Sequence, residues 1–205
     1  MSEQGARRYP RTFHGLIVSM VVLVIVVVVY WALNNVTHDT PNEGGSAVDY
    51  RSAVHDVQAA GAPLKVVYPT SLPQGWKATS ADYAPPSGPG TGPTWGLGVV
   101  TDHDSFVGLR LEATPLTALV ATYIDKNASS DGQKTLHTAL GDAWSTFSDA
   151  GGDTGYAMQL GDDVLLVYGS ADKADFTTFM QSLTQAELPG VSSPASPAGS
   201  VSPLG

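Results

Sequence analysis

The chain of 205 residues has no cysteine and few charged side chains, 14% in all. The absence of cysteine excludes a small domain stapled by disulfides and any thiolate chemistry. Only 10 residues are lysine or arginine, against 19 aspartates and glutamates, so the formal charge is −9. A chain this acidic lacks the basic surface that nucleic-acid binding requires. The sequence also lacks the common catalytic and phosphate-binding motifs, namely G-x-S-x-G, the P-loop and H-E-x-x-H.

What the chain does contain is a long apolar run. In Leu16–Leu33, 13 of 18 residues are leucine, isoleucine or valine, and none is charged. At about 1.5 Å per residue such a helix is roughly 27 Å long, close to the thickness of the hydrocarbon core. The run predicts one transmembrane helix over residues 15–34, with the lipid bilayer as its partner.

The charges flanking this run predict its orientation. Residues 1–33 hold three arginines and one glutamate (+2), whereas residues 34–205 hold seven basic and 18 acidic side chains (−11). By the positive-inside rule, residues 1–14 are a basic cytoplasmic tail and the acidic remainder is extracytoplasmic. A cleaved signal peptide is the alternative. It fits less well, because the apolar run is long and Asn34–Thr37 offers no A-x-A cleavage pattern.

Composition divides the extracytoplasmic part into three segments. Residues 35–48 are polar and rich in glycine and asparagine, which is typical of a flexible linker. Residues 49–188 carry the patterned apolar residues of a folded domain. Residues 189–205 consist mainly of serine, proline, alanine and glycine, and are expected to be a disordered tail that serves as a spacer or carries O-linked sugar.

Capping residues and helical periodicity predict three helices in the domain. The first begins at Asp49 and ends at Gly61, the second begins at Thr114–Pro115 with threonine as the cap, and the third begins at Asp172. The second is expected to end within residues 126–130. The apolar faces that these helices must bury are Ala53, Val54, Val57 and Ala60; Leu116, Leu119, Val120, Tyr123 and Ile124; and Phe176, Phe179, Met180 and Leu183.

Short runs rich in aromatic and β-branched residues, separated by turn residues, predict the strands. The predicted strands are Lys65–Tyr68, Trp76–Tyr83, Trp95–Thr101, Phe106–Ala113, Lys134–Ala139, Ala143–Ser148, Thr154–Leu160 and Val164–Gly169. Short turns between successive strands imply antiparallel pairing, and three one-sided helices need a sheet to cover them. We therefore expect an α+β fold in which an antiparallel sheet of about 7–8 strands is flanked by helices and preceded by one transmembrane helix.

Candidate site residues are sparse. Asp102–His103–Asp104 places three potential metal ligands within three positions, but aspartate also favours turns, and a site needs ligands from elsewhere. Asp162–Asp163 is interpreted in the same way, as a hairpin tip. His55 and His137 have no partner that their spacing identifies. The sequence therefore assigns no catalytic, metal or cofactor-binding residue and no cofactor, and it leaves the ligand-binding residues unknown.

Large aromatic residues and glycosylation patterns are open to two interpretations. Trp76, Tyr83, Trp95 and Trp144 are expected to fill the core of the sheet, and the alternative is a groove for sugar or lipid. Asn35–Thr37 and Asn127–Ser129 match the N-glycosylation pattern, which matters only in a secretory host.

Several short segments resemble a known family. Tyr68–Pro69 with Leu72–Trp76, the Thr94–Gly96 segment and the closing helix DFTTFMQSL are similar to an actinobacterial family of single-pass membrane proteins, domain of unknown function 4245. The resemblance covers roughly residues 8–188. It implies a sheet flanked by helices, and it transfers no activity or site residue.

Three functional hypotheses follow. The first is a membrane-anchored binding or scaffold module of the cell envelope, with an envelope protein, lipid or glycan as its partner. The alternative is an envelope hydrolase, in which the fold assembles Asp102, His103, His55 or His137 with an acidic partner. The third is a sensory ectodomain, which would need a membrane partner because the cytoplasmic tail is too short for a signalling domain.

Overall fold

The computed structural model describes residues 47–190 of the chain. Within that range no helix is long and apolar enough to cross a membrane. The predicted cytoplasmic tail (1–14), the transmembrane helix (15–34) and most of the linker (35–48) lie outside the described residues, as does nearly all of the Ser/Pro-rich tail (189–205). The fold below is therefore that of the predicted extracytoplasmic domain.

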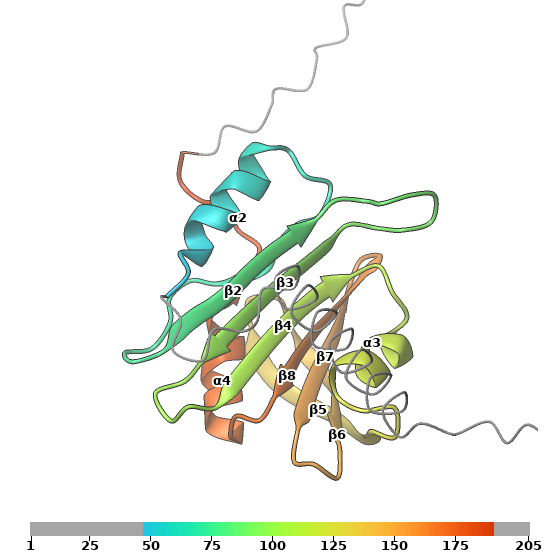
Figure 1. The fold of residues 1–205 in the computed structure, drawn as a ribbon. Coiled ribbons are helices and arrows are strands. Elements are labelled where there is room, and N and C mark those ends of the chain that lie inside the picture. The colour runs from blue at the N-terminus through green and yellow to red at the C-terminus, as the bar shows by residue number, and fades with distance from the viewer. Residues whose placement is uncertain (1–46, 191–205) are drawn as a thin grey trace, which may run out of the picture. The chain divides into compact units, whose positions relative to one another are not determined.

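Three helices and nine strands make up these residues. The helices are α2 (Tyr50–Ala59), α3 (Leu116–Tyr123) and α4 (Lys173–Ser182). The strands are β1 (Tyr68–Pro69), β2 (Lys77–Ala84), β3 (Thr94–Val100), β4 (Phe106–Glu112), β5 (Ser129–Thr138), β6 (Gly141–Ser148), β7 (Thr154–Leu160), β8 (Asp163–Gly169) and β9 (Leu183–Thr184). Figure 1 shows how they are arranged.

Seven strands form one antiparallel sheet in the order β2-β3-β4-β8-β7-β6-β5. Every neighbouring pair is antiparallel, and hairpins connect β2 to β3, β3 to β4, β5 to β6, β6 to β7 and β7 to β8. The pairing of β4 with β8 joins the two halves of the chain. The sheet is strongly twisted, with β5 and β6 turned behind β7 in Figure 1. The predicted α+β class and antiparallel sheet are confirmed.

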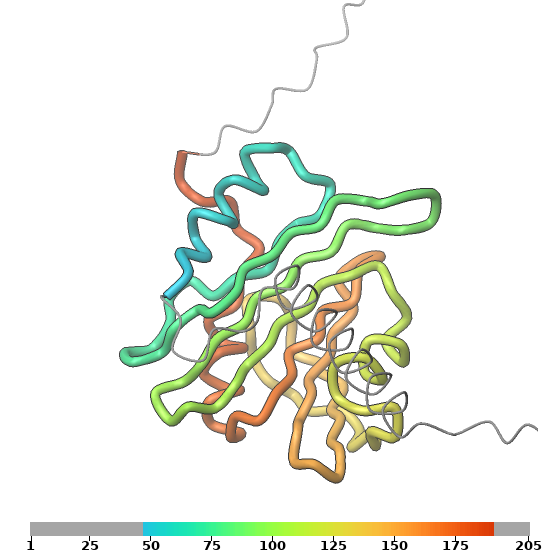
Figure 2. Tube along the Cα trace, in the orientation of Figure 1, coloured from blue at the N-terminus to red at the C-terminus, as the bar shows by residue number. Residues whose placement is uncertain are grey.

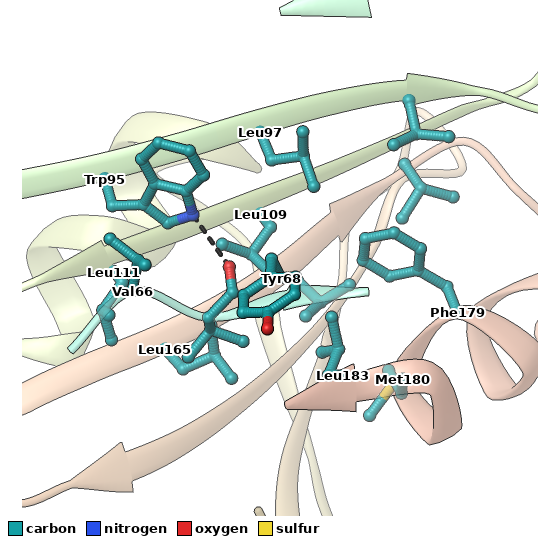
Figure 3. Close-up of a cluster of buried hydrophobic side chains, with 14 of the residues drawn as sticks. Val66, Tyr68, Trp95, Leu97, Leu109, Leu111, Leu165, Phe179, Met180 and Leu183 are labelled. Carbon is teal, nitrogen blue, oxygen red and sulfur yellow. Dashed lines mark hydrogen bonds between the residues drawn. The ribbon is translucent and has the colours of Figure 1, made fainter. Parts of the chain in front are cut away.

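The larger core lies on the inner face of the sheet. Alternate residues of β3 and β4 point into it, including Trp95, Leu109 and Leu111, and α4 covers them with Phe179 and Met180. Figure 3 shows these side chains converging between the sheet and α4. Val107, Leu109 and Leu111 of β4 are buried, as the sequence predicted for one buried face, although Gly108 between them is buried as well.

A smaller core lies on the outer face, under α3. Leu119 and Val120 of this helix pack on Ala157, Val164 and Leu166 of β7 and β8. The predicted stripe of α3 is therefore confirmed as a packing surface. Because α3 contains only eight residues, it covers one part of the outer face.

The first predicted strand, Lys65–Tyr68, is wrong in extent and in partner. Only Tyr68–Pro69 is extended and paired, and its partner is β9, outside the large sheet. Val66, Val67 and Tyr68 are consecutive and all buried, so the segment lacks the alternation of buried and exposed residues that a one-sided strand shows. The apolar residues of this segment are explained by burial in the core and not by a place in the large sheet. Pro69 also lacks the backbone N–H that a longer β-ladder would need.

The prediction that Thr114 caps α3 is also wrong. Pro115 is the N-cap residue, with an extended ψ of 134°, and no side chain bonds the first turn of the helix. The fixed φ of proline suits a cap as well as a first helical position, so the sequence did not distinguish the two. The helix ends at Tyr123, before the predicted residues 126–130, and β5 begins at Ser129, ahead of the predicted Lys134.

The other two predicted caps are confirmed. The Asp49 carboxylate accepts hydrogen bonds from the N–H groups of Arg51 and Ser52, and the Asp172 carboxylate accepts from those of Ala174 and Asp175. Both contacts satisfy donors that a helix leaves free in its first turn.

After α4 the chain returns alongside α2, as the tube in Figure 2 shows. The Gln58 side chain of α2 donates to the carbonyl of Ala186 and accepts from the N–H of Leu188. The Tyr68 hydroxyl donates to the same Ala186 carbonyl at 2.9 Å. These bonds hold the C-terminal segment of the domain against its first helix, although about 130 residues separate the two in sequence.

Candidate functional site

The histidines of the predicted hydrolase site each pair with a nearby acid on the surface. Nδ1 lies 3.4 Å from Asp56 in His55, 3.1 Å from Asp102 in His103 and 3.1 Å from Asp142 in His137. The three imidazoles are 47%, 76% and 84% exposed. Across residues 47–190 no group of three or more His, Asp or Glu side chains is placed to hold a metal ion.

The Asp102–Asp104 segment forms the tight turn between β3 and β4. Thr101 Oγ1 accepts from the N–H groups of His103 and Ser105, and Asp104 adopts a positive φ of 57°. Asp175 of α4 lies within electrostatic reach. Partial burial raises the pKa of its carboxyl, Asp172 and Asp102 add to the rise, and His103 opposes it. The turn interpretation is confirmed.

Asp162–Asp163 lies at the hairpin between β7 and β8. The carbonyl of Asp163 accepts from the Gln159 side chain, and burial raises the pKa of the Asp163 carboxyl, with a smaller contribution from Asp162. These residues therefore build the tip of a hairpin, as the sequence predicted.

The tryptophans belong to the core, which confirms the first of the two interpretations. Trp95 and Trp144 are fully buried and Trp76 is 9% exposed, while Tyr83 packs against the core from its edge. Trp95 Nε1 donates to the carbonyl of Val67 at 2.8 Å, the bond drawn in Figure 3. Trp144 Nε1 is buried and has no hydrogen-bond partner within residues 47–190.

A seam opens in the sheet between β6 and β7. The two strands are in register only from Ser145–Ser148 against Thr154–Ala157. Gly141–Trp144 of β6 and Met158–Leu160 of β7 are not paired with each other. On their other edges, β6 is paired with β5 and β7 with β8. The Thr138 hydroxyl bonds both the N–H and the carbonyl of Gly141, so the part of the β6 edge that a ligand could pair with is Asp142–Trp144.

A hollow with a volume of about 470 Å³ lies at this seam. We call it the seam hollow. Small-molecule sites are typically 300–1,000 Å³ with mainly apolar walls and a few polar groups. The lining residues are Leu116, Leu140, Gly141, Ala143, Ala157, Met158 and Val164, with Gln133, Asp142, Ser145 and Gln159 as the polar members.

Gly141 and Met158 meet at this seam. Gly141 has a φ of 143°, and a Cβ on it would lie 3.1 Å from the terminal methyl of Met158. A side chain at position 141 would therefore crowd Met158, which belongs to the larger core. Asp142 lines the hollow and contacts His137, so this is the His–Asp pair that the hydrolase hypothesis would have to use.

A second, smaller hollow of about 50 Å³ lies on the outer face of β2, β3 and β4. We call it the Arg110 hollow. The Arg110 guanidinium carbon lies 4.9 Å from the centre of the Tyr123 ring, and the Tyr123 hydroxyl donates to Glu112 at 3.0 Å. Burial, reinforced by Glu112, raises the pKa of Tyr123 to about 12 against the opposing charge of Arg110. The network ties α3 to β4 and fixes the position of the guanidinium.

Sequence reasoning found neither hollow. The seam depends on a register that ends after four residue pairs, and no sequence pattern encodes where a ladder stops. The Arg110 hollow had one visible signal, the alternation of glycine with large apolar residues in TWGLGVV, where Gly96 and Gly98 share a strand face.

The chain belongs to the family described as "Protein of unknown function (DUF4245)", whose model matches residues 8–183. The predicted family is thereby confirmed. No curated protein matches the chain. Among solved structures, it is similar to a chain of the Pseudomonas aeruginosa MucA/MucB complex, with 16% sequence identity and a TM-score of 0.30. That similarity covers 58% of this chain and 34% of the other, so the chain spans about a third of that protein's length.

Proposed function

We propose that this DUF4245 protein is a membrane-anchored, extracytoplasmic binding module of the cell envelope, and that its ligand occupies the seam hollow. The anchor and orientation rest on the apolar run Leu16–Leu33 and the arginines that precede it. The binding role rests on one observation, the separation of β6 from β7 beyond Ser145–Ser148. Beyond these four pairs the two strands border the hollow, and an unpaired strand edge beside a hollow favours an occupant that pairs with it.

The walls of the seam hollow favour a neutral, partly apolar ligand. Gln133 and Ser145 offer neutral hydrogen-bonding groups, whereas the Gln159 amide N–H groups are engaged by the carbonyls of the β7–β8 turn. Asp142 is the one charged side chain of the lining. A strong anion would meet this carboxylate with no lysine or arginine in the lining to balance it. Leu116, Leu140 and Met158 supply the apolar contact that gives most small ligands their affinity.

The unpaired strand edges favour a ligand that can form hydrogen bonds along the strands. Asp142–Trp144 and Met158–Leu160 border the hollow without pairing with each other, the arrangement by which sheets bind extended peptides. An envelope lipid or glycan would use the side-chain amides and the apolar walls instead. Both kinds of ligand require the hollow to be open, which is the property that the experiment tests.

The test compares two tryptophan substitutions of exposed alanines on strands. Ala143 lines the seam hollow, so Ala143→Trp fills it, whereas Ala84 at the end of β2 is not part of its lining. The full chain in lipid nanodiscs is incubated with an organic and an aqueous extract of its native envelope, washed, and analysed by native mass spectrometry. We expect one bound species on the wild type and on Ala84→Trp, and its loss from Ala143→Trp. The absence of any bound species on the wild type, or its full retention by Ala143→Trp, would refute the proposal.

A further inference from the structure

Three glycines lie beneath the Arg110 hollow, and neighbouring side chains bury all of them. Gly96 and Gly98 occupy two successive outward positions of β3, and Gly98 stands opposite Gly108 of β4. A Cβ on Gly96 would lie 2.7 Å from Arg110 Nη1 and 3.0 Å from its Cζ. The guanidinium therefore lies flat against the backbone of β3, in a space that any larger residue at position 96 would take.

Aromatic rings form the rim of this hollow. A Cβ on Gly108 would lie 2.6 Å from the Tyr168 ring and 2.9 Å from that of Phe106. The two rings meet edge to face with centroids 6.0 Å apart, and both remain partly exposed. The rim therefore offers partly exposed aromatic surface next to a fixed guanidinium.

Two opposite charges line the hollow without touching. Its lining is Ser80, Asp82, Gly96, Leu97, Gly98, Phe106, Leu109, Arg110 and Tyr168. Arg110 is the one cation of this set and Asp82 the one anion. Within residues 47–190 the ion pairs closer than 4.0 Å are the three His–Asp pairs, so Arg110 and Asp82 do not bond each other. The hollow thus presents fixed donors on one side, a carboxylate on the other and the Ser80 hydroxyl beside it.

We infer that the Arg110 hollow is a binding site for a neutral glycan, separate from the seam hollow. A hydroxyl-bearing group accepts hydrogen bonds from Arg110 and donates to Asp82, which balances both charges without a net ligand charge. The volume of about 50 Å³ admits one such group and no whole ring. The sugar ring then contacts the exposed parts of Phe106 and Tyr168, whose planes lie 65° apart, so that one ring meets it with its face and the other with its edge.

The experiment measures binding of named oligosaccharides to the full chain in nanodiscs by isothermal titration calorimetry. The neutral probes are maltopentaose, galactotetraose and arabinopentaose. A trigalacturonate and a neutral Ser-Gly-Ser amide test the two competing ligand chemistries. We expect at least one neutral oligosaccharide to bind with a millimolar or lower Kd, and the trigalacturonate and the peptide to bind more weakly.

Three substitutions locate the binding. Arg110→Lys removes the planar fork of donors and keeps the charge, and Asp82→Asn removes the acceptor charge at an exposed position that tolerates the change. Each is expected to weaken glycan binding at least about tenfold, the effect of one charge-assisted hydrogen bond. Arg51→Lys, at an exposed arginine of α2, is the matched control and is expected to bind like the wild type.

Each other outcome overturns the inference. It fails if no neutral oligosaccharide binds at 10 mM, if trigalacturonate or the peptide binds most tightly, or if either Arg110→Lys or Asp82→Asn, correctly folded, binds like the wild type. Circular dichroism of each variant checks the fold. If Arg110→Lys does not fold, the glycan affinity of Asp82→Asn alone tests the inference. Ala143→Trp is expected to bind glycan normally, which separates a failure here from a failure of the seam hollow.

Discussion

Trp95 and Trp144 can both be replaced by phenylalanine, and they differ in whether the indole N–H makes a hydrogen bond within residues 47–190. Both side chains are fully buried on the inner face of the sheet. Trp95 Nε1 donates to the Val67 carbonyl at 2.8 Å, whereas Trp144 Nε1 has no partner in the described part of the chain. Replacing each with phenylalanine removes the same atoms, so the difference between the two variants isolates the hydrogen bond.

The expected magnitudes follow from two terms. Loss of the larger ring costs about 1–2 kcal/mol of transfer free energy in either variant. Trp95→Phe also leaves a buried carbonyl without its donor, which costs a further 1–3 kcal/mol or so. Trp144→Phe removes an unsatisfied donor, and this relief offsets most of its transfer loss. We therefore expect Trp95→Phe to be less stable than Trp144→Phe by about 2 kcal/mol, or roughly 4–8 °C in Tm.

The assay is urea unfolding of the full chain in detergent, followed by far-ultraviolet circular dichroism so that the lost fluorophore does not affect the signal. The two free energies of unfolding are compared at equal m-values, since a changed m-value would indicate a different unfolded state. Equal losses within about 0.5 kcal/mol, or a larger loss for Trp144→Phe, would refute the assignment of the hydrogen bond as the distinguishing interaction.

Further substitutions test the caps, one glycine and one tyrosine. Asp172→Ala should cost about 1 kcal/mol of unfolding free energy in urea titrations, whereas Thr114→Ala, at the rejected cap, should cost less than about 0.5 kcal/mol. Gly169→Ala should lower stability by at least about 2 kcal/mol, because its φ is 139° and a Cβ would clash with a facing backbone carbonyl; Gly88→Ala, in open space, should leave it unchanged. The raised pKa of Tyr123, about 12, means that the native state keeps a proton that the unfolded chain releases near pH 10. Stability should therefore fall as pH rises from about 10 to about 12, and Tyr123→Phe should reduce that fall in urea titrations at pH 9 and 11.

Much of the local structure was predictable because its causes are local. Asp49 and Asp172 cap helices through bonds to N–H groups two and three residues away. The turn at Asp102–Ser105 and the alternation in Phe106–Glu112 likewise act within a few residues. The failures at Lys65–Tyr68 and Thr114 have one cause: the same residues suit two local conformations, and packing chose between them.

The candidate site was less predictable. The histidines attracted attention because their chemistry is conspicuous in a sequence, yet each pairs with an exposed acid close to it along the chain. The two hollows are lined mainly by glycine, alanine, serine and aliphatic residues, which carry no signature of chemistry. Arg110 became notable only when the glycine beneath it and the uncontacted Asp82 were placed beside it.

The sequence by itself determined the composition of the chain, its apolar run, its charge asymmetry, its family and the order of most of its elements. These follow from hydrophobicity, charge and capping, each of which acts along the chain. Only the tertiary structure decided that β4 pairs with β8, that β1 leaves the sheet to join β9, and that β6 separates from β7. Such pairings depend on how side chains more than 50 residues apart share one core, and the free energy of that packing cannot be read from neighbours in sequence.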